Sequence, residues 1–253
     1  MMDYVKRNTN APNGFFACEA AGLRWLAHAQ GGVPCARVVA VDEASLTLER
    51  LTPSPPTAAV ARDFGARLAR THDAGADGFG AAPSGWDGPG FFGPLHQPLP
   101  MAYANEASWG AFYAECRLAP MAARASLDTE TRAAVDAVIR RCRAGDFDDV
   151  EVPARLHGDL WGGNVMWTPD GVVLIDPAAH GGCRETDLAM LALFGCPHLD
   201  AVLDGYQSEH RLRDGWRDRI GLHQLYPLLA HVVLFGSGYR AQTRAAAVSG
   251  CRL

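Results

Sequence analysis

One short segment of the sequence combines residue types and spacing that suit phosphoryl transfer. Residues 156–164 read LHGDLWGGN, and Asp176 follows at the end of an apolar run. Transfer of a phosphoryl group from a nucleotide needs a carboxylate beside the acceptor hydroxyl and oxygen ligands for Mg²⁺ on the phosphates. The H-x-D-x-x-x-x-N spacing predicts that Asp159 accepts the substrate proton. It also predicts that Asn164 and Asp176 bind the metal.

The specificity of this pattern comes from its parts taken together. A His-Gly-Asp triplet alone is too common to indicate a kinase, but here an asparagine follows Asp159 at the kinase spacing and Asp176 follows a Pro-Asp-Gly turn. In loops of this kind the histidine mostly braces the loop, so we expect a structural role for His157. Because positioning and charge neutralisation do most of the work in this chemistry, a loop braced between strands suits it.

The loop must be held by strands and helices on both sides of it. Residues 165–167 and 172–175 favour two strands joined by a tight turn at Thr168–Gly171. From Glu185 to about Gly250 the pattern is helical, with interruptions at 195–197 and at Gly215. Three further helices are predicted upstream, at Thr57–Ala74, Glu106–Leu118 and Asp128–Arg143.

The N-terminal part of the chain favours a small mixed unit. Helical spacing extends from Phe15 to His28, and two short runs at 37–41 and 45–51 indicate a hairpin. Prolines at 53, 55 and 56 exclude both a helix and a central strand there. We therefore divide the chain into a small lobe at 1–51, a linker at 52–56, and a helical lobe at 57–253 that contains the catalytic loop 155–177. A stretch rich in Gly and Pro, Gly75–Pro100, has no periodicity and is expected to be a functional loop or a lid.

Composition and charge exclude several classes of protein. The 253 residues carry a formal net charge of −5, which argues against binding to duplex DNA. Seven scattered cysteines, never spaced C-x-x-C, indicate neither a disulfide framework nor a zinc cluster. The sequence shows no apolar stretch near the roughly 18 residues that span a bilayer. We expect a soluble cytoplasmic protein with no nucleic-acid or membrane partner, while the oligomeric state stays open.

The sequence also resembles a known family. The segment 156–164, together with IDPA at 175–178 and RETDLAM at 184–190, is similar to the fructosamine (ketosamine) kinase family. The H-G-D-x-x-x-x-N and D-L-A motifs belong to the whole aminoglycoside-phosphotransferase-like kinase superfamily, whereas the tryptophan after H-G-D-L and the D-P-A triplet are narrower. Further matches at 4–6, 19–23, 48–51 and 225–239 extend the resemblance from residue 4 to about residue 240.

The resemblance implies both a fold and an activity. The fold is α+β, a two-lobed protein-kinase-like fold with a truncated small N-lobe, made of a helix and a short antiparallel sheet, and a mainly helical C-lobe. The implied activity is ATP-dependent and Mg²⁺-dependent phosphorylation of the sugar 3-hydroxyl of ketosamines, which are fructosamines or ribulosamines formed by glycation of amines. The partner is then a small-molecule or protein-bound ketosamine, and the role is deglycation.

The resemblance also assigns roles to single residues. Lys6 matches the strand lysine that holds the nucleotide phosphates, and Glu19 matches its helix partner. Glu49, Arg50 and Leu51 match the hinge whose backbone meets adenine.

Four more positions are matched on the substrate side and behind the loop. Trp161 and His231 match positions that line the sugar pocket, where a flat indole face suits the C–H groups of a sugar. Arg184 and Asp187 are expected to brace the catalytic loop, and Arg184 is also a candidate for contact with an anionic substrate.

One departure from the family pattern leaves alternatives open. Family members carry a hairpin with a Gly-rich turn before the strand lysine, and no G-x-G-x-x-G precedes Lys6 here. One alternative is a catalytically impaired nucleotide-binding protein. Another is a kinase of the same superfamily that acts on a different small molecule, such as an aminoglycoside.

Overall fold

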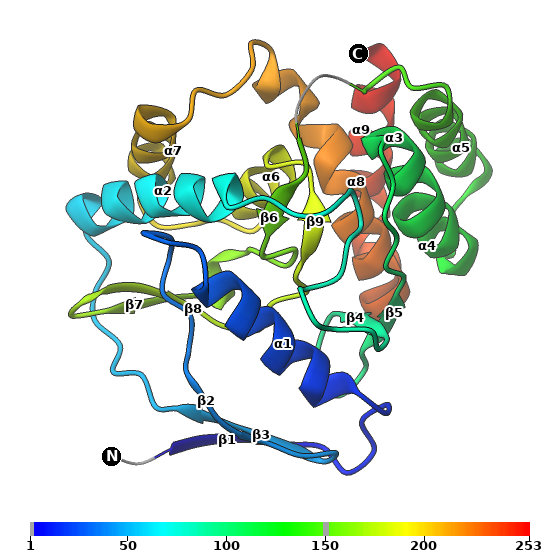
Figure 1. The fold of residues 1–253 in the computed structure, drawn as a ribbon. Coiled ribbons are helices and arrows are strands. Elements are labelled where there is room, and N and C mark those ends of the chain that lie inside the picture. Colours follow the sequence, from blue (N-terminus) through cyan, green and yellow to red (C-terminus); the bar gives the residue numbers. More distant parts are fainter. Residues whose placement is uncertain (1–2, 149–151) are drawn as a thin grey trace.

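A computed structural model describes residues 3–148 and 152–253 of the chain. The nine α-helices of the described part are α1 Phe15–Ala27, α2 Ala58–Asp73, α3 Trp109–Phe112, α4 Ala119–Arg124, α5 Thr129–Arg143, α6 Glu185–Leu193, α7 Leu199–Glu209, α8 Trp216–Phe235 and α9 Arg240–Arg252. Its strands are β1 Asp3–Arg7, β2 Val38–Val41, β3 Ser45–Glu49, β4 Gly90–Phe92, β5 Leu99–Met101, β6 Ala154–Leu156, β7 Val165–Thr168, β8 Gly171–Leu174 and β9 His180–Gly182. Figure 1 shows the N-terminal sheet at one end and most of the helices at the other.

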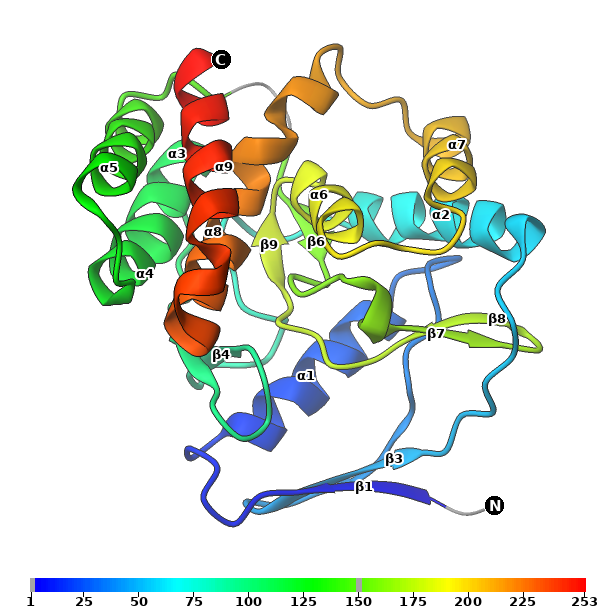
Figure 2. The same cartoon turned by 180° about the vertical axis from the view of Figure 1, so that it is seen from behind.

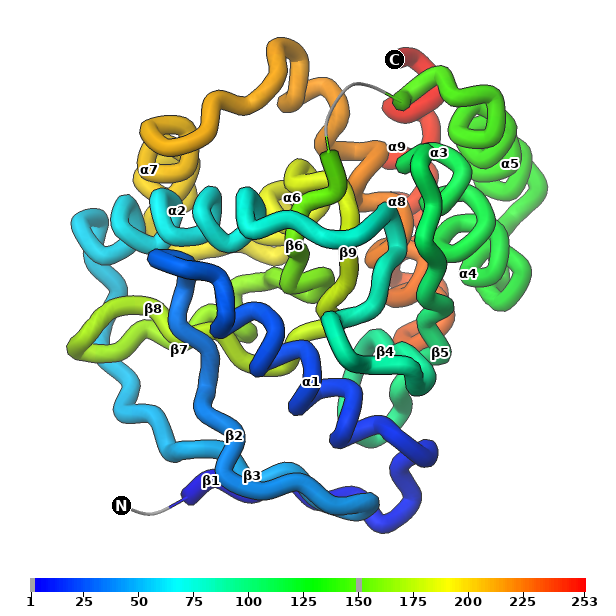
Figure 3. The backbone as a smooth tube through the Cα atoms, viewed as in Figure 1, coloured from blue at the N-terminus to red at the C-terminus, as the bar shows by residue number. Residues whose placement is uncertain are grey.

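The N-terminal part is a small antiparallel sheet with one helix beside it. Its strand order is β1-β3-β2, which places Lys6 of β1 opposite Leu46 of β3. Helix α1 packs against this sheet through a cluster that includes Phe16, Leu23 and Leu48. The predicted helix and hairpin are therefore confirmed. The tube in Figure 3 follows the chain from this sheet through α1 and back to β2 and β3.

Two small antiparallel strand pairs hold the segment predicted to be catalytic. Strands β7 and β8 form the predicted hairpin, whose turn joins Thr168 and Gly171. Strand β6 pairs with β9, and Leu156 lies opposite His180. No sequence pattern predicts β9, because a run of His-Gly-Gly has low strand propensity and pairs only through its backbone. The loop 157–164, which carries the predicted Asp159 and Asn164, leaves β6 and enters β7, so both of its ends are fixed.

Helices α2 and α7 approach each other closely at two glycines. A Cβ atom on Gly65 would lie 1.8 Å from the Val202 carbonyl oxygen, and one on Gly205 would lie 1.9 Å from the Arg62 carbonyl oxygen. Only glycine permits this backbone contact. Figure 2 shows the two helices side by side, on the side of the β7–β8 hairpin away from the N-terminal sheet.

Helix α8 contains a proline whose effect on hydrogen bonding is repaired by a tyrosine. Pro227 lies inside the helix, and a proline there removes one backbone hydrogen bond. The Tyr113 hydroxyl donates to the Leu222 carbonyl at 2.8 Å, lies 3.4 Å from the His223 carbonyl that loses its helical donor at Pro227, and accepts from the Tyr226 N–H at 3.2 Å. The hydroxyl thus satisfies two groups of the opened helix turn.

This insertion gives a testable prediction for stability. Tyr113→Phe should lower the free energy of unfolding by about 2 kcal/mol, because it leaves a buried N–H and a buried carbonyl unpaired. Urea unfolding measures the change. Tyr4→Phe is the matched control, because Tyr4 is 48% exposed. This variant should have the same free energy of unfolding as the parent protein. Equal stability of the two variants would contradict the inserted hydrogen bonds.

Two predicted elements differ from the structure. The stretch Gly75–Pro100 is not wholly irregular, because residues 90–92 and 99–101 pair as the hairpin of β4 and β5. The helix expected at Glu106–Leu118 begins only at Trp109, after the Ser108 cap, and continues as a π-helical turn at Tyr113–Leu118. Periodicity does not reveal either feature, since short strands and single π turns lack a repeating pattern.

One helical run passes the length and hydropathy test for a membrane span. It covers Trp216–Arg252, within the residues that the structure describes, and half of its most apolar window is buried inside the protein. It is an exception to the expectation that no apolar stretch approaches this length. A core helix passes the same test, and Leu222, Leu225 and Leu229 of this run belong to the largest hydrophobic cluster.

Candidate active site

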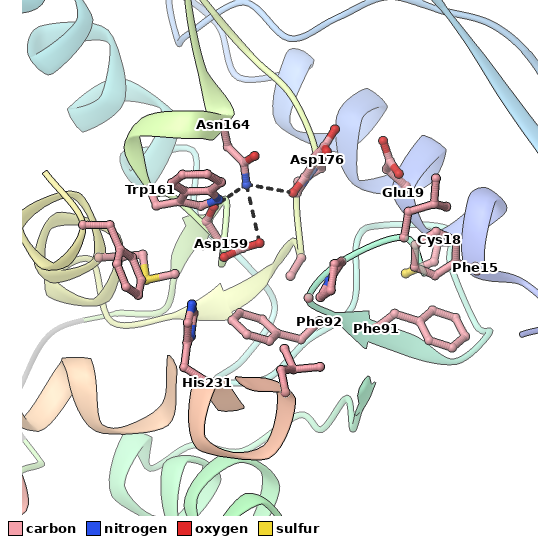
Figure 4. Close-up of a pocket in the computed structure, with 18 of the residues that line it drawn as sticks. Phe15, Cys18, Glu19, Phe91, Phe92, Asp159, Trp161, Asn164, Asp176 and His231 are labelled. Atoms are coloured by element: carbon pink, nitrogen blue, oxygen red, sulfur yellow. Dashed lines mark hydrogen bonds between the residues drawn. The ribbon is translucent and has the colours of Figure 1, made fainter. Parts of the chain in front are cut away.

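The loop between β6 and β7 brings Asp159 and Asn164 together. The Asn164 side-chain Nδ2 donates to the Asp159 carbonyl at 2.8 Å and lies 3.4 Å from the Asp176 carbonyl. Figure 4 shows these three residues gathered around the Asn164 amide. The three residues predicted from spacing are therefore neighbours in space.

The Asp187 side chain holds the start of this loop in place through hydrogen bonds to its backbone. Its carboxylate accepts from the backbone N–H of His157 at 2.7 Å and of Gly158 at 2.9 Å. The buried His72 ring lies 3.2 Å from the same carboxylate through Nε2. Burial disfavours the charged form of Asp187, but these hydrogen bonds and the His72 ring outweigh burial and lower its pKa. The Asp187 carboxylate thus holds two loop amides.

Removing that charge should loosen the loop. Asp187→Asn keeps the size of the side chain but loses the acceptor for one of the two N–H groups, so we expect a loss of about 2 kcal/mol of stability. Activity should fall with it, because the loop carries Asp159. Thermal unfolding and initial rates together measure the effect. Asp170→Asn, in the exposed β7–β8 turn, is the control, and an equal effect of both changes would overturn the bracing role.

His157 has a structural position. Its Nε2 donates to the Ile175 carbonyl at 2.8 Å, and its Nδ1 accepts from the Asp159 N–H at 3.3 Å. Burial lowers the pKa of His157, which keeps the ring neutral. The ring therefore ties the loop to the residue before Asp176. This arrangement is the one expected of a bracing histidine.

Asp176, the second residue after β8, occupies a strained backbone position. Its φ is +55°, which is uncommon for residues other than glycine and is often found at functional sites. Its carboxylate contacts the Lys6 ammonium, and Lys6 Nζ also lies 2.7 Å from Glu19 Oε1. Lys6 therefore links strand β1, helix α1 and the strand end that carries Asp176.

The charges of this site interact strongly. Burial raises the pKa of Asp159 to about 7, and the Asp176 and Asp187 carboxylates add to the shift. Burial likewise raises the pKa of Glu19 to about 7, against the opposing charge of Lys6. Burial disfavours the charged form of Lys6, but Glu19 and Asp176 outweigh it and raise the Lys6 pKa. The site has more carboxylates than its one ammonium neutralises.

Arg184 lies behind the loop and away from the cavity. Its guanidinium donates to Asp73 at 3.0 Å and to the Tyr206 hydroxyl at 3.1 Å, and its side chain is 4% exposed. The Tyr206 hydroxyl also meets the His72 ring at 2.7 Å. Arg184 thus supports the bracing network around Asp187. A direct contact between this arginine and a substrate does not fit that position.

A cavity of about 660 Å³ connects the predicted residues. Seven of them line it, namely Lys6, Glu19, Asp159, Trp161, Asn164, Asp176 and His231. Figure 4 shows Trp161 and His231 on one side of Asp159 and Glu19 on the other. The cavity therefore extends on both sides of the expected base.

The predicted hinge lies outside this lining. Among the described residues that line the cavity, Glu49, Arg50 and Leu51 are absent. Glu49 accepts from the Arg37 N–H at 3.0 Å, and Arg50 lies 3.3 Å from the Asp3 carbonyl. Leu51 packs with the apolar cluster between the sheet and β8. Contact of these residues with adenine stays a prediction.

Other lining residues were missed by the sequence analysis. The β4–β5 hairpin contributes residues 91–95, and α8 with the turn after it contributes Leu234, Phe235 and Tyr239. The only signal in the first case is the pair of aromatic residues before Gly93-Pro94. For α8 and the turn after it, helical spacing predicts a helix but does not show which face of the helix lines the cavity.

The donor set suits a hard cation. Asn164 and Asp176 offer an amide oxygen and a carboxylate, and Mg²⁺ is usually held by one or two carboxylates together with phosphates and water. Among the described residues, no group of three or more His, Cys, Asp or Glu side chains is arranged to hold a metal by itself. These residues thus fit Mg²⁺ that is bound with a nucleotide.

Known proteins resemble this chain in sequence and in fold. A profile of the fructosamine kinase family matches residues 2–249. An Enterococcus faecium protein assigned as a ketoamine kinase is 32% identical over 246 residues, which cover 94% of this chain and 84% of that protein. A Thermobifida fusca protein of known crystal structure, assigned as a fructosamine-3-kinase, is 45% identical to this chain, with a TM-score of 0.90. The match covers 99% of this chain and 86% of the Thermobifida fusca chain.

A more distant structure shows the wider fold. The macrolide 2'-phosphotransferase of Brachybacterium faecium is 15% identical to this chain, with a TM-score of 0.59, and the match covers 98% of this chain and 83% of that one. The likeness is one of fold. It confirms the predicted kinase-like architecture, which combines short antiparallel sheets with a helical C-terminal part.

Proposed function

Because the chain belongs to the fructosamine kinase family, we propose that it phosphorylates the sugar 3-hydroxyl of ketosamines at the expense of ATP. The observation that carries this proposal is the convergence of Lys6, Asp159, Asn164 and Asp176 in one cavity. The family implies the use of ATP, usually with a divalent metal. The position of the hydroxyl, the substrate and the deglycation role are our proposals.

Four side chains would bind the metal and the nucleotide phosphates or support that binding. Asn164 and Asp176 would hold Mg²⁺, which would supply charge neutralisation at the nucleotide phosphates. Lys6 would contact the phosphates, so its present contact with Asp176 must open when the nucleotide binds. The Glu19 carboxylate, 2.7 Å from Lys6, would keep the ammonium in place on its other side.

Asp159 acts as the base. Its pKa of about 7 lies near neutrality, so a proton can be accepted from the hydroxyl at that pH. Asn164 holds the Asp159 backbone through the 2.8 Å hydrogen bond, which orients the carboxylate. The loop is thus arranged before the substrate arrives.

Trp161 and His231 would bind the sugar. Trp161 is 41% exposed on the cavity side of the loop, and its flat face suits sugar C–H groups. The His231 Nδ1 donates to the Pro227 carbonyl at 2.7 Å, which leaves Nε2 as an acceptor. Burial lowers the pKa of His231, so the ring is neutral and can accept from a sugar hydroxyl.

Turnover assays separate this proposal from its alternatives. Purified protein is incubated with ATP, Mg²⁺ and a fructosamine, or with an aminoglycoside, and ADP release is measured. We expect turnover with the fructosamine alone. Turnover with the aminoglycoside alone would identify the other kind of kinase, and nucleotide binding with no turnover on either would identify an impaired kinase.

A further inference from the structure

The cavity continues past Asp159 into a region that we call the aromatic arm. Its side chains come from the catalytic loop, the end of α6, α8 and the turn that follows α8. They are Trp161, Phe194, His231, Leu234, Phe235 and Tyr239. Figure 4 shows Trp161 and His231 of this arm facing the space beside Asp159.

The arm is a packed group of rings with a defined shape. The His231 ring centroid lies 4.6 Å from that of Phe194, 4.9 Å from that of Tyr239 and 5.2 Å from that of Phe235. The Trp161 ring meets Phe194 edge to face at 6.4 Å. Such mutual contacts fix ring orientations, so the arm presents an ordered apolar wall.

The wall leaves apolar surface uncovered. Phe235 is 54% exposed and Trp161 is 41% exposed, although most large hydrophobic side chains of the described residues are buried. Exposed apolar surface that lines a cavity is typical of a binding site. With the sugar on Trp161, a ligand group with a flat apolar face would cover Phe235.

Formal charge is confined to the other end of the cavity. Among the described lining residues, the charged side chains are Lys6, Glu19, Asp159 and Asp176, and all four belong to the proposed phosphoryl-transfer site. The titratable ring of the arm, His231, is kept neutral by burial. A carboxylate placed in the arm would have no cationic partner and would face the carboxylates beside it, which is unfavourable.

The chemistry of a ketosamine fits this division. Its amine nitrogen is attached at C1, two carbons along the chain from the hydroxyl that we propose is phosphorylated. With that hydroxyl at Asp159, a protonated amine nitrogen lies near the carboxylates, and the substituent on the nitrogen points away from the sugar. The arm is the part of the cavity that can receive it.

We propose that Phe194, Leu234, Phe235 and Tyr239 of the aromatic arm bind the amine substituent of the substrate, next to the sugar held by Trp161 and His231, and select ketosamines of uncharged aromatic amines over those that carry a free carboxylate. The inference rests on the proposed ketosamine kinase activity and adds the chemical class of the amine. Covering one phenyl ring with the arm should raise kcat/KM about tenfold.

Three matched ketosamines test this selectivity on the whole chain. They are the fructosamines of methylamine, benzylamine and 4-(aminomethyl)benzoic acid, so that the second adds a ring and the third adds a carboxylate to that ring. We expect kcat/KM for the benzyl compound to be about tenfold above that for the methyl compound. The kcat/KM for the fructosamine of 4-(aminomethyl)benzoic acid should be no higher than that for the methyl compound, because the carboxylate removes the gain from the ring.

Two substitutions locate the effect in the arm. Phe235→Ala should lower the benzyl-to-methyl ratio of kcat/KM about fivefold. Phe235→Arg should raise the benzoate-to-benzyl ratio, because it supplies the missing cation. The exposed side chain at this position tolerates either change. Val39→Ala, at a 42% exposed residue of β2, is the control and should leave all ratios as in the parent protein.

The outcomes distinguish the two proposals. If none of the three fructosamines is phosphorylated, the proposed function itself is wrong. If all three are phosphorylated with equal kcat/KM, or if the benzoate is preferred, the kinase activity stands and the role of the arm is refuted. A benzyl preference that survives Phe235→Ala and Phe235→Arg unchanged would also refute it.

Discussion

Asp159→Asn should remove nearly all turnover and at the same time stabilise the free protein. The amide cannot accept the proton of the substrate hydroxyl, so kcat should fall about 1,000-fold. The carboxylate that it replaces is held at a raised pKa of about 7 by burial and by Asp176 and Asp187. Removing a charge that the fold disfavours should add about 2 kcal/mol of stability at pH 8, allowing for the partial exposure of the group.

The pH dependence of this gain has a definite sign. The Asp159 pKa is about 7 in the folded protein against an ordinary value of 3.8. The folded state therefore binds this proton more tightly than the unfolded state, and its contribution to stability is full below pH 3.8 and is lost as the pH rises through 7. Asp159→Asn should thus gain little at pH 4 and most at pH 8.

Thermal unfolding of both proteins across this range measures the effect. Asp170→Asn, a change of the same kind in the exposed hairpin turn, should alter neither activity nor the pH dependence. A variant that is inactive and less stable than the parent at pH 8 would show that Asp159 is not a disfavoured charge in the free protein.

Lys6→Arg should lower kcat/KM for ATP about 100-fold, mainly through a higher KM. Lys6 is the one lysine of the chain, and its ammonium fits between Glu19 and Asp176. A planar guanidinium keeps the charge, but it cannot replace a compact ammonium between two carboxylates and a phosphate. Steady-state kinetics with varied ATP measure the loss.

The neighbouring residue offers a matched control. Arg7→Lys makes the reverse exchange at the next position of β1, where the side chain is exposed, and should leave the KM for ATP unchanged. If Lys6→Arg behaves like this control, Lys6 does not hold the phosphates.

Much of the site could be predicted because its residues are close in sequence. Asp159 and Asn164 lie on one loop, and the hairpin of β7 and β8 returns the chain to Asp176. Turn residues and strand-forming residues specify that hairpin locally. The contact of Lys6 with Glu19 could be predicted from the resemblance, and the structure confirms it at 2.7 Å.

The rest depends on packing between distant segments. No local pattern places Phe92 beside α8, where its ring lies 5.0 Å from that of Tyr226. Nor does one place Phe91 beside α1, where its ring lies 5.4 Å from that of Phe15. Nor does periodicity show that Tyr113 repairs the turn opened by Pro227. Helical spacing gives the buried face of each helix but not its partner.

The central claim is tested most directly by identifying the phosphorylated product. The protein is incubated with ATP, Mg²⁺ and a fructosamine labelled with ¹³C in the sugar, and the product is examined by ³¹P and ¹³C NMR, with Asp159→Asn as the negative control. We predict one new phosphate ester, with ³¹P coupling at C3, that is absent with the variant. Phosphate on another carbon, or no ester at all from folded protein that binds ATP, would contradict the account.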